Sequence, residues 1–192
     1  MKNVLILLLI ALLSAPVFAG EAPAVGGDAP AFNLQDQNGE WHKLEDYRGQ
    51  WLAVYFYPRD DTPGCTKEAC NFRDNIYAFK AVGAAVVGIS VDDVESHKEF
   101  SDKYKLPFTL LADEDNETSR AYGVLKDYKL VKLASRQSFL VNPEGKIAKH
   151  YDDVDPDTHT DEVLADIKAF MSMDGRQIAG AGAIRQTRKF GI

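Results

Sequence analysis

The segment YPRDDTPGCTKEAC, residues 57–70, holds both cysteines of the chain and constrains its fold most strongly. The apolar run that precedes it, residues 51–57, predicts a buried strand. Beyond it, Phe72, Ile76 and Phe79 recur at helical spacing and predict an amphipathic helix. The Pro, Asp and Gly residues in between are typical of a turn. We therefore expect Cys65 at the point where a strand gives way to a helix.

This position favours a reactive thiol at Cys65. The first N–H groups of a helix lack partners within the helix, and the positive end of its dipole favours a nearby anion, so a thiol there is pushed towards thiolate. Thr62 brings a hydroxyl within reach of the sulfur, while Pro58 and Pro63 fix backbone angles and lack N–H donors. Simpler roles fit too, because Thr62 can be a helix N-cap and Pro58 a strand terminator.

The spacing of the two cysteines argues against a permanent disulfide. On one continuous helix, five positions give a rise of about 7.5 Å and a turn of about 140°, so the two Cα atoms would lie about 8–9 Å apart. A disulfide needs less than about 7 Å. A bond between Cys65 and Cys70 would thus require the first helical turns to unwind, which suits a bond that is made and broken in each cycle.

Pro58-x-x-x-Thr62-x-x-Cys65, with a second cysteine at Cys70, resembles the active site of peroxiredoxins of the bacterioferritin-comigratory-protein or Q-type subgroup. The resemblance extends over roughly residues 25–172. It includes the segments 29–34, 55–58, 122–124 and 136–141. It implies an α/β, thioredoxin-like fold with a central mixed β-sheet and helices on both faces.

The resemblance also implies a thiol-dependent peroxidase that reduces hydrogen peroxide and organic hydroperoxides. Cys65 would be the peroxidatic cysteine, which becomes a sulfenic acid, and Cys70 the resolving cysteine, which forms an intramolecular disulfide with it. A thioredoxin-like dithiol would reduce that disulfide. We expect a monomer without cofactor or metal.

Four further site positions follow from the same resemblance. Arg136 would lie beside the sulfur, favour its thiolate and hold the peroxide oxygens, although a strand-end arginine in a surface ion pair is the simpler interpretation. Thr62 would orient the peroxide, and Pro58 would shield the sulfur from water. The backbone N–H groups of Gly64 and Cys65 would stabilise charge on the leaving oxygen.

Two other functions are possible on the same fold: thiol-disulfide exchange and copper binding. A thiol-disulfide exchange protein normally carries Cys-x-x-Cys, whereas four residues separate Cys65 from Cys70. A copper-binding protein would need closely spaced cysteines and a distal histidine, for which His150 or His159 could be proposed. The cysteine spacing and the presence of Thr62 disagree with both.

Residues 1–19 have the features of a signal peptide. Lys2 precedes an apolar run over residues 4–13, and small residues lead to Ala19. About ten apolar residues are too few to span a bilayer, which takes about 20. We expect cleavage after Ala19, a periplasmic or secreted protein and no stable membrane insertion; an uncleaved N-terminal anchor is the alternative.

The remaining sequence predicts one domain between two flexible ends. Residues 20–28 are rich in Ala, Pro and Gly, and residues 174–192 are rich in Gly and Ala and then basic, so both are expected to be flexible. The domain itself would span residues 29–173. Loss of residues 1–19 changes the net charge from −7 to −7 − 1 = −8, because one Lys and no acid is removed. A chain with this negative net charge is a poor nucleic-acid binder.

The periodicity predicts the order of elements in this domain. Strands are expected at 32–34 (as an edge strand), 51–57, 84–89, 109–112, 136–141 and 147–151, with helices after residue 64, at 94–103, at 117–122 and at 160–171.

Overall fold

A computed structural model describes the backbone of residues 20–187 and the side chains of residues 20–173. The expected signal peptide, residues 1–19, lies outside the described residues. Within the described part of the chain, no helix is both long and apolar enough to cross a membrane.

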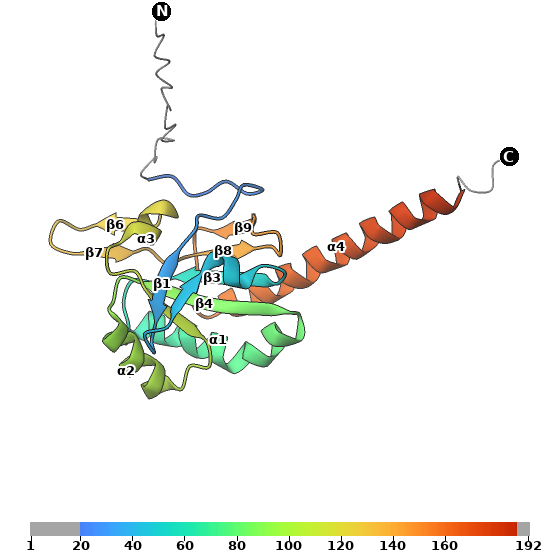
Figure 1. Cartoon of the computed structure of the whole chain (residues 1–192). Helices are drawn as coiled ribbons and strands as arrows, with labels where there is room; N and C mark the ends of the chain where they lie inside the picture. The colour runs from blue at the N-terminus through green and yellow to red at the C-terminus, as the bar shows by residue number, and fades with distance from the viewer. Residues whose placement is uncertain (1–19, 188–192) are drawn as a thin grey trace, which may run out of the picture.

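A seven-stranded mixed sheet forms the centre of the domain, in the order β2-β1-β5-β4-β3-β8-β9 (Figure 1). Its strands are β1 (Asn33–Asp36), β2 (Trp41–Lys43), β3 (Trp51–Phe56), β4 (Ala84–Ser90), β5 (Thr109–Ala112), β8 (Gln137–Val141) and β9 (Ile147–Tyr151). The three central strands β3, β4 and β5 are parallel, and every other pairing is antiparallel.

Helices cover both faces of this sheet. The helical segments are η1 (Leu44–Tyr47), α1 (Pro63–Ala81), α2 (Val94–Tyr104), α3 (Glu117–Ala121) and α4 (His159–Thr187). The apolar side chains of α1, α2 and α4 join the core on one face, whereas η1 and the chain after α3 join the core on the other. A small hairpin, β6 (Leu125–Asp127) with β7 (Lys132–Ala134), stands apart from the main sheet. The predicted thioredoxin-like α/β architecture is confirmed.

Strand β3 is buried along its whole length because it serves both cores. Trp51 and Tyr55 face the core beneath α1, while Leu52 and Phe56 face the opposite core. Each such fully buried side chain stabilises the fold by about 1.5–3 kcal/mol. A continuous apolar run, rather than alternation, is therefore what this position requires.

The carboxyl ends of β3, β4 and β5 meet at one edge of the sheet, and α1 begins there. Pro63 occupies the first turn of α1, where a missing N–H costs nothing because that group has no helical partner. The turn that the sequence predicted between residues 57 and 64 thus places the start of α1, with Cys65, over the end of the central strands.

The N-terminal segment differs from expectation. Residues 20–28 were expected to be flexible, but residues 26–28 pair with the start of β9: the Gly26 N–H donates to the Ile147 carbonyl at 2.8 Å, and Asp28 forms an antiparallel bridge with Lys146. Such backbone bonds need no particular side chain, so composition does not reveal them. The expected edge strand also differs, since β1 lies between β5 and β2, and β2 forms the edge.

The C-terminal helix also differs from expectation. A helix was predicted over residues 160–171, followed by a tail from residue 174, but α4 continues to Thr187 and projects away from the body of the domain (Figure 1). No Pro interrupts this stretch, and Ala, Arg and Gln favour a helix. The mobility expected of residues 174–192 stays a prediction, and residues 188–192 lie outside the described part.

Candidate active site

The start of α1 sets the position of Thr62. This residue occupies the N-cap position with extended backbone angles, φ −88° and ψ 150°, but its side chain makes no capping bond. Its hydroxyl instead donates to the Arg59 carbonyl at 3.0 Å. The simple N-cap interpretation is therefore wrong for the side chain, and the lone pairs of the Thr62 oxygen are left for another donor.

Cys65 lies in the first turn of α1 and is 1% exposed. Arg136, 71 positions further along the chain, donates from Nη2 to its Sγ at 3.2 Å. The strand pairing explains this contact: Gln137 pairs with Phe56 at the end of β3, so the residue before it falls beside the start of α1. The structure thus brings Arg136 to the sulfur, as predicted.

Glu68 is a site residue that the sequence analysis missed. It is fully buried and forms an ion pair with Nη1 of Arg136. Burial raises the pKa of Glu68 to about 7, and the charge of Arg136 opposes that rise. One guanidinium thus faces both the sulfur and a carboxyl. The sequence contains a signal for the position of Glu68: residues three apart on a helix lie on one face, and Glu68 follows Cys65 by three.

Tyr55 also lies close to this group. Its hydroxyl is buried and has no hydrogen-bond partner among the described residues, and the same holds for Oε1 of Glu68. Burial raises the pKa of Tyr55, and the nearby Glu68 raises it further. Gly88 on β4 makes room for the ring, since a Cβ there would lie 2.7 Å from the Tyr55 hydroxyl.

Gly64 lets the guanidinium approach the helix. A Cβ at this position would lie 3.1 Å from Nη2 of Arg136, which is tighter than ordinary contact. Pro58 follows the end of β3 and is half-buried. The structure places Pro58, Thr62, Gly64 and Cys65 in one turn, as their sequence order requires.

Cys70 lies about 1.4 turns further along the same helix, and both cysteines are free thiols. Because α1 is continuous from Pro63, the distance of about 8–9 Å expected between the two Cα atoms applies. The outer side of this segment is tied to the loop before α4: Nδ2 of Asn71 donates to the Pro156 carbonyl at 2.7 Å, and Lys67 pairs with Asp157. A Cys65–Cys70 disulfide would require this part of α1 to unwind.

A family model described as "AhpC/TSA family" matches residues 25–150. The chain belongs to this family. It is 46% identical over 151 residues to a chloroplastic peroxiredoxin Q of Populus jackii, a match that covers 78% of this chain and 68% of the relative. A putative peroxiredoxin bcp of Coxiella burnetii is 46% identical over 144 residues, covering 73% and 95%. The chain spans 64% of a similar protein of rice.

Solved structures give the same assignment. A cysteine-to-serine mutant of Xylella fastidiosa PrxQ matches with a TM-score of 0.74 at 32% identity, covering 79% of this chain and 99% of that one. The bacterioferritin comigratory protein of Xanthomonas campestris, studied for alkyl peroxide reduction, matches with a TM-score of 0.69 at 36% identity, covering 72% and 91%. This AhpC/TSA family member is thus of the peroxiredoxin Q type.

The histidines proposed as copper ligands are hydrogen-bonded to other side chains. Nε2 of His159 shares a hydrogen bond of 2.8 Å with the Ser138 hydroxyl, and burial lowers the pKa of His159 to about 4. Nε2 of His150 contacts the Gln137 side-chain oxygen at 2.9 Å. Among the described residues, the single group with metal-ligand spacing contains no cysteine; it consists of Asp36, Glu40 and His42. Copper binding at Cys65 is not favoured.

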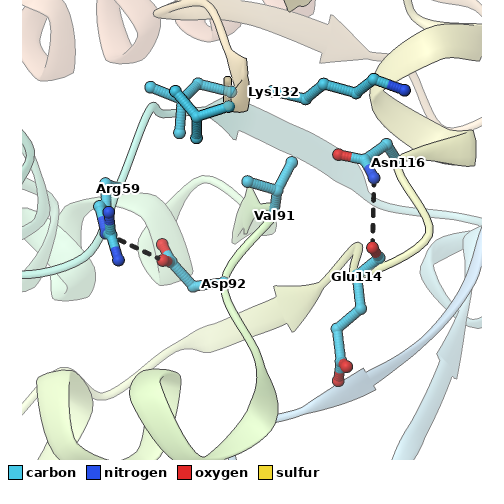
Figure 2. A pocket seen from close by; sticks show the side chains of 8 residues that line it. Arg59, Val91, Asp92, Glu114, Asn116 and Lys132 are labelled. Atoms are coloured by element: carbon cyan, nitrogen blue, oxygen red, sulfur yellow. Dashed lines mark hydrogen bonds and ion pairs between the residues drawn. The ribbon is translucent and has the colours of Figure 1, made fainter. Parts of the chain in front are cut away.

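A surface pocket of about 360 Å³ opens beside the active-site turn, at the carboxyl ends of the central strands. Figure 2 shows Arg59 directed towards Asp92, with which it pairs at 3.7 Å, and Lys132 on the far side of the hollow. Its lining consists of Arg59, Val91, Asp92, Glu114, Asn116, Val131, Lys132 and Leu133. Neither cysteine lines it, so the reacting sulfur lies outside this pocket.

Proposed function

We propose that the chain is a thiol-dependent peroxidase that reduces hydrogen peroxide and organic hydroperoxides. The observation that carries the proposal is the contact between Arg136 and the sulfur of Cys65 at the start of α1. A fixed positive charge and the helix N-terminus both stabilise a thiolate, and the membership of the AhpC/TSA family agrees with peroxide as the electrophile.

The first step transfers one oxygen from the peroxide to the sulfur. The Cys65 thiolate attacks the nearer peroxide oxygen, an S–O bond forms while the O–O bond breaks, and the leaving oxygen takes up a proton to depart as water or an alcohol. Thr62 orients the peroxide, and Arg136 together with the N–H groups of Gly64 and Cys65 stabilises the negative charge on the leaving oxygen. Pro58 shields the site from water.

The second step forms the intramolecular disulfide. The Cys70 thiol attacks the sulfenic sulfur of Cys65, water leaves, and an S–S bond forms. The first turns of α1 unwind to bring the two sulfurs together. A thioredoxin-like dithiol then reduces the disulfide by thiol exchange and is itself oxidised.

The location and the assembly state belong to the same proposal. Removal of residues 1–19 would deliver a monomeric enzyme to the periplasm or the exterior, where an extracytoplasmic dithiol protein serves as reductant. Mass spectrometry of the exported protein tests this: a chain that begins at Gly20 supports it, and a chain that begins at Met1 rejects it. Sedimentation as a dimer would reject the monomer.

Thiol counting with intact mass tests the chemistry. Reduced protein, mixed with about one equivalent of hydrogen peroxide, should lose both thiols within seconds. Cys70→Ser should gain one oxygen atom at Cys65, and Cys65→Ser should not react. If neither thiol of the unchanged protein reacts faster than free cysteine, the peroxidase proposal fails.

A further inference from the structure

A buried carboxylate ties the active-site turn to α2. Oδ1 of Asp60 accepts a hydrogen bond from the Tyr57 hydroxyl at 2.7 Å, and Oδ2 accepts one from the Ser96 hydroxyl at 2.8 Å. Oδ2 also faces Nδ1 of His97 at 2.7 Å. His97 is fully buried and Asp60 is 9% exposed. We call these four residues, Tyr57, Asp60, Ser96 and His97, the Asp60 anchor.

The backbone of the same turn is held on its other side. The Asp60 N–H donates to Oδ2 of Asp92 at 2.9 Å, and Arg59 pairs with the same carboxylate (Figure 2). The next residue, Asp61, has a φ of 54°, an uncommon conformation for a residue other than Gly, and accepts a hydrogen bond from Tyr104 at 2.6 Å. A turn that contains such a residue keeps its path only where the surroundings fix it.

The position of the Thr62 hydroxyl depends on the path of this turn, whereas the position of the Cys65 sulfur does not. The Thr62 hydroxyl is bonded to the Arg59 carbonyl, so it moves with the turn. Cys65 is held by the hydrogen bonds of α1 and by Arg136. The carboxylate of Asp60 is therefore placed to control the position of the hydroxyl more than that of the sulfur.

We propose that Asp60 and His97 are positioning residues, which hold the Thr62 hydroxyl where it meets the peroxide. This inference rests on the proposed role of Thr62 in orienting the substrate. A buried carboxylate that loses a donor must find another, and the turn has to shift to supply it. A displacement of about 1 Å at a reacting group costs up to about 100-fold in rate.

The test compares two reactions of the same sulfur. Oxidation of Cys65 by hydrogen peroxide needs the Thr62 hydroxyl, whereas alkylation of Cys65 by iodoacetamide does not. In His97→Leu, the rate of oxidation should fall about 10- to 100-fold, while the rate of alkylation should not fall. His97→Asn, whose amide nitrogen can replace Nδ1 as a donor to Asp60, should recover most of the lost rate.

Asp93→Ala is the matched control. Asp93 caps α2 by accepting the Ser96 N–H at 2.8 Å, so its loss weakens the helix while the Asp60 anchor keeps its bonds. This variant should unfold at a lower temperature and still react with peroxide at the normal rate. An equal loss of rate in Asp93→Ala and His97→Leu would show that only the stability of α2 matters.

Three further results decide the inference. If His97→Leu is folded and oxidises at the normal rate, or if oxidation and alkylation fall equally, His97 is not a positioning residue. If His97→Leu does not fold, Ser96→Ala replaces it, and an unchanged ratio of oxidation to alkylation rejects the inference. If the unchanged protein does not react with peroxide, the proposed function fails instead, so the two failures are distinguishable.

Discussion

The two cysteines lie five positions apart on α1, yet their surroundings differ. Cys65 is 1% exposed and receives a hydrogen bond from the partly buried Arg136. Cys70 is half-buried, and Arg73, which lies next to it and interacts with its thiol, also pairs with the exposed Asp74 and donates to the Tyr104 carbonyl. One cysteine is held as a fixed reaction centre, and the other lies on the part of the helix that faces outward.

This difference separates the two steps of the proposed cycle. The peroxide step needs a sulfur whose neighbours do not move, and the ion pair between Arg136 and buried Glu68 provides this. The disulfide step needs a helix segment that can leave its place. Polar contacts outside the core, such as those of the half-buried Asn71 and the exposed Lys67, hold the Cys70 segment and can be broken at small cost.

The largest effect should come from the arginine beside Cys65. Arg136→Lys keeps the charge but loses the planar guanidinium, which contacts the Cys65 sulfur and the Glu68 carboxylate at the same time. We expect the rate of Cys65 oxidation by hydrogen peroxide to fall about 100- to 1000-fold, as for the loss of a donor to developing negative charge. Stopped-flow measurement of the reduced protein gives this rate.

Arg73→Lys is the matched control for that prediction. It makes the same change beside Cys70, where Arg73 contacts Asp74 and the Tyr104 carbonyl, and should leave the rate of Cys65 oxidation unchanged. If the two variants lose equal activity, the contrast between the two arginines is wrong.

Glu68 should make the stability of the protein decrease with pH. The pKa of Glu68 is about 7 in the folded protein, against 4.5 in the unfolded chain, so the folded state binds the extra proton between these values. The free energy of unfolding should then fall by about 3 kcal/mol as pH rises from 4.5 to 7. Glu68→Gln should lack this fall, which urea unfolding at several pH values would measure.

The control for this measurement is Glu99→Gln, which changes an exposed glutamate of α2. Its unfolding free energy should follow that of the unchanged protein over the same pH range. If the unfolding free energy of Glu68→Gln changes with pH as that of the unchanged protein does, the pKa of Glu68 is the same in the folded and unfolded states. The prediction of a raised pKa in the folded protein is then wrong.

The sequence predicts local features of the site well and distant ones poorly. The turn that carries Pro58, Thr62 and Cys65 follows from apolar runs, Pro and Gly within fifteen positions, and the structure confirms it. Arg136 was placed by family resemblance alone, because its contact with Cys65 arises from the pairing of β8 with β3. Burial of His97 against Asp60, 37 positions away, has no comparable sequence signal.

The same reason explains the errors in the fold. Strands β3 and β5 could be predicted because each is a short, mostly apolar run of residues. The pairing of residues 26–28 with β9 uses backbone groups, which every sequence possesses. The length of α4 depends on the absence of Pro rather than on an apolar face. Neither feature leaves a pattern in the apolar residues.

The smallest effect should come from the contacts that hold the Cys70 segment. Asn71→Ala removes the bond to the Pro156 carbonyl, a stabilisation of about 1 kcal/mol that must be lost when α1 unwinds. Disulfide formation after oxidation of Cys65 should therefore be about 5-fold faster, while the peroxide step stays unchanged. Asn75→Ala is the control, because among the described residues Nδ2 of Asn75 bonds within the helix, to the Asn71 carbonyl. Its loss should not accelerate disulfide formation to the same extent. Rapid-quench mass spectrometry separates the two steps. If Asn71→Ala forms the disulfide no faster than Asn75→Ala, the loop before α4 does not restrain Cys70, and the slow motion lies in the buried first turn of α1.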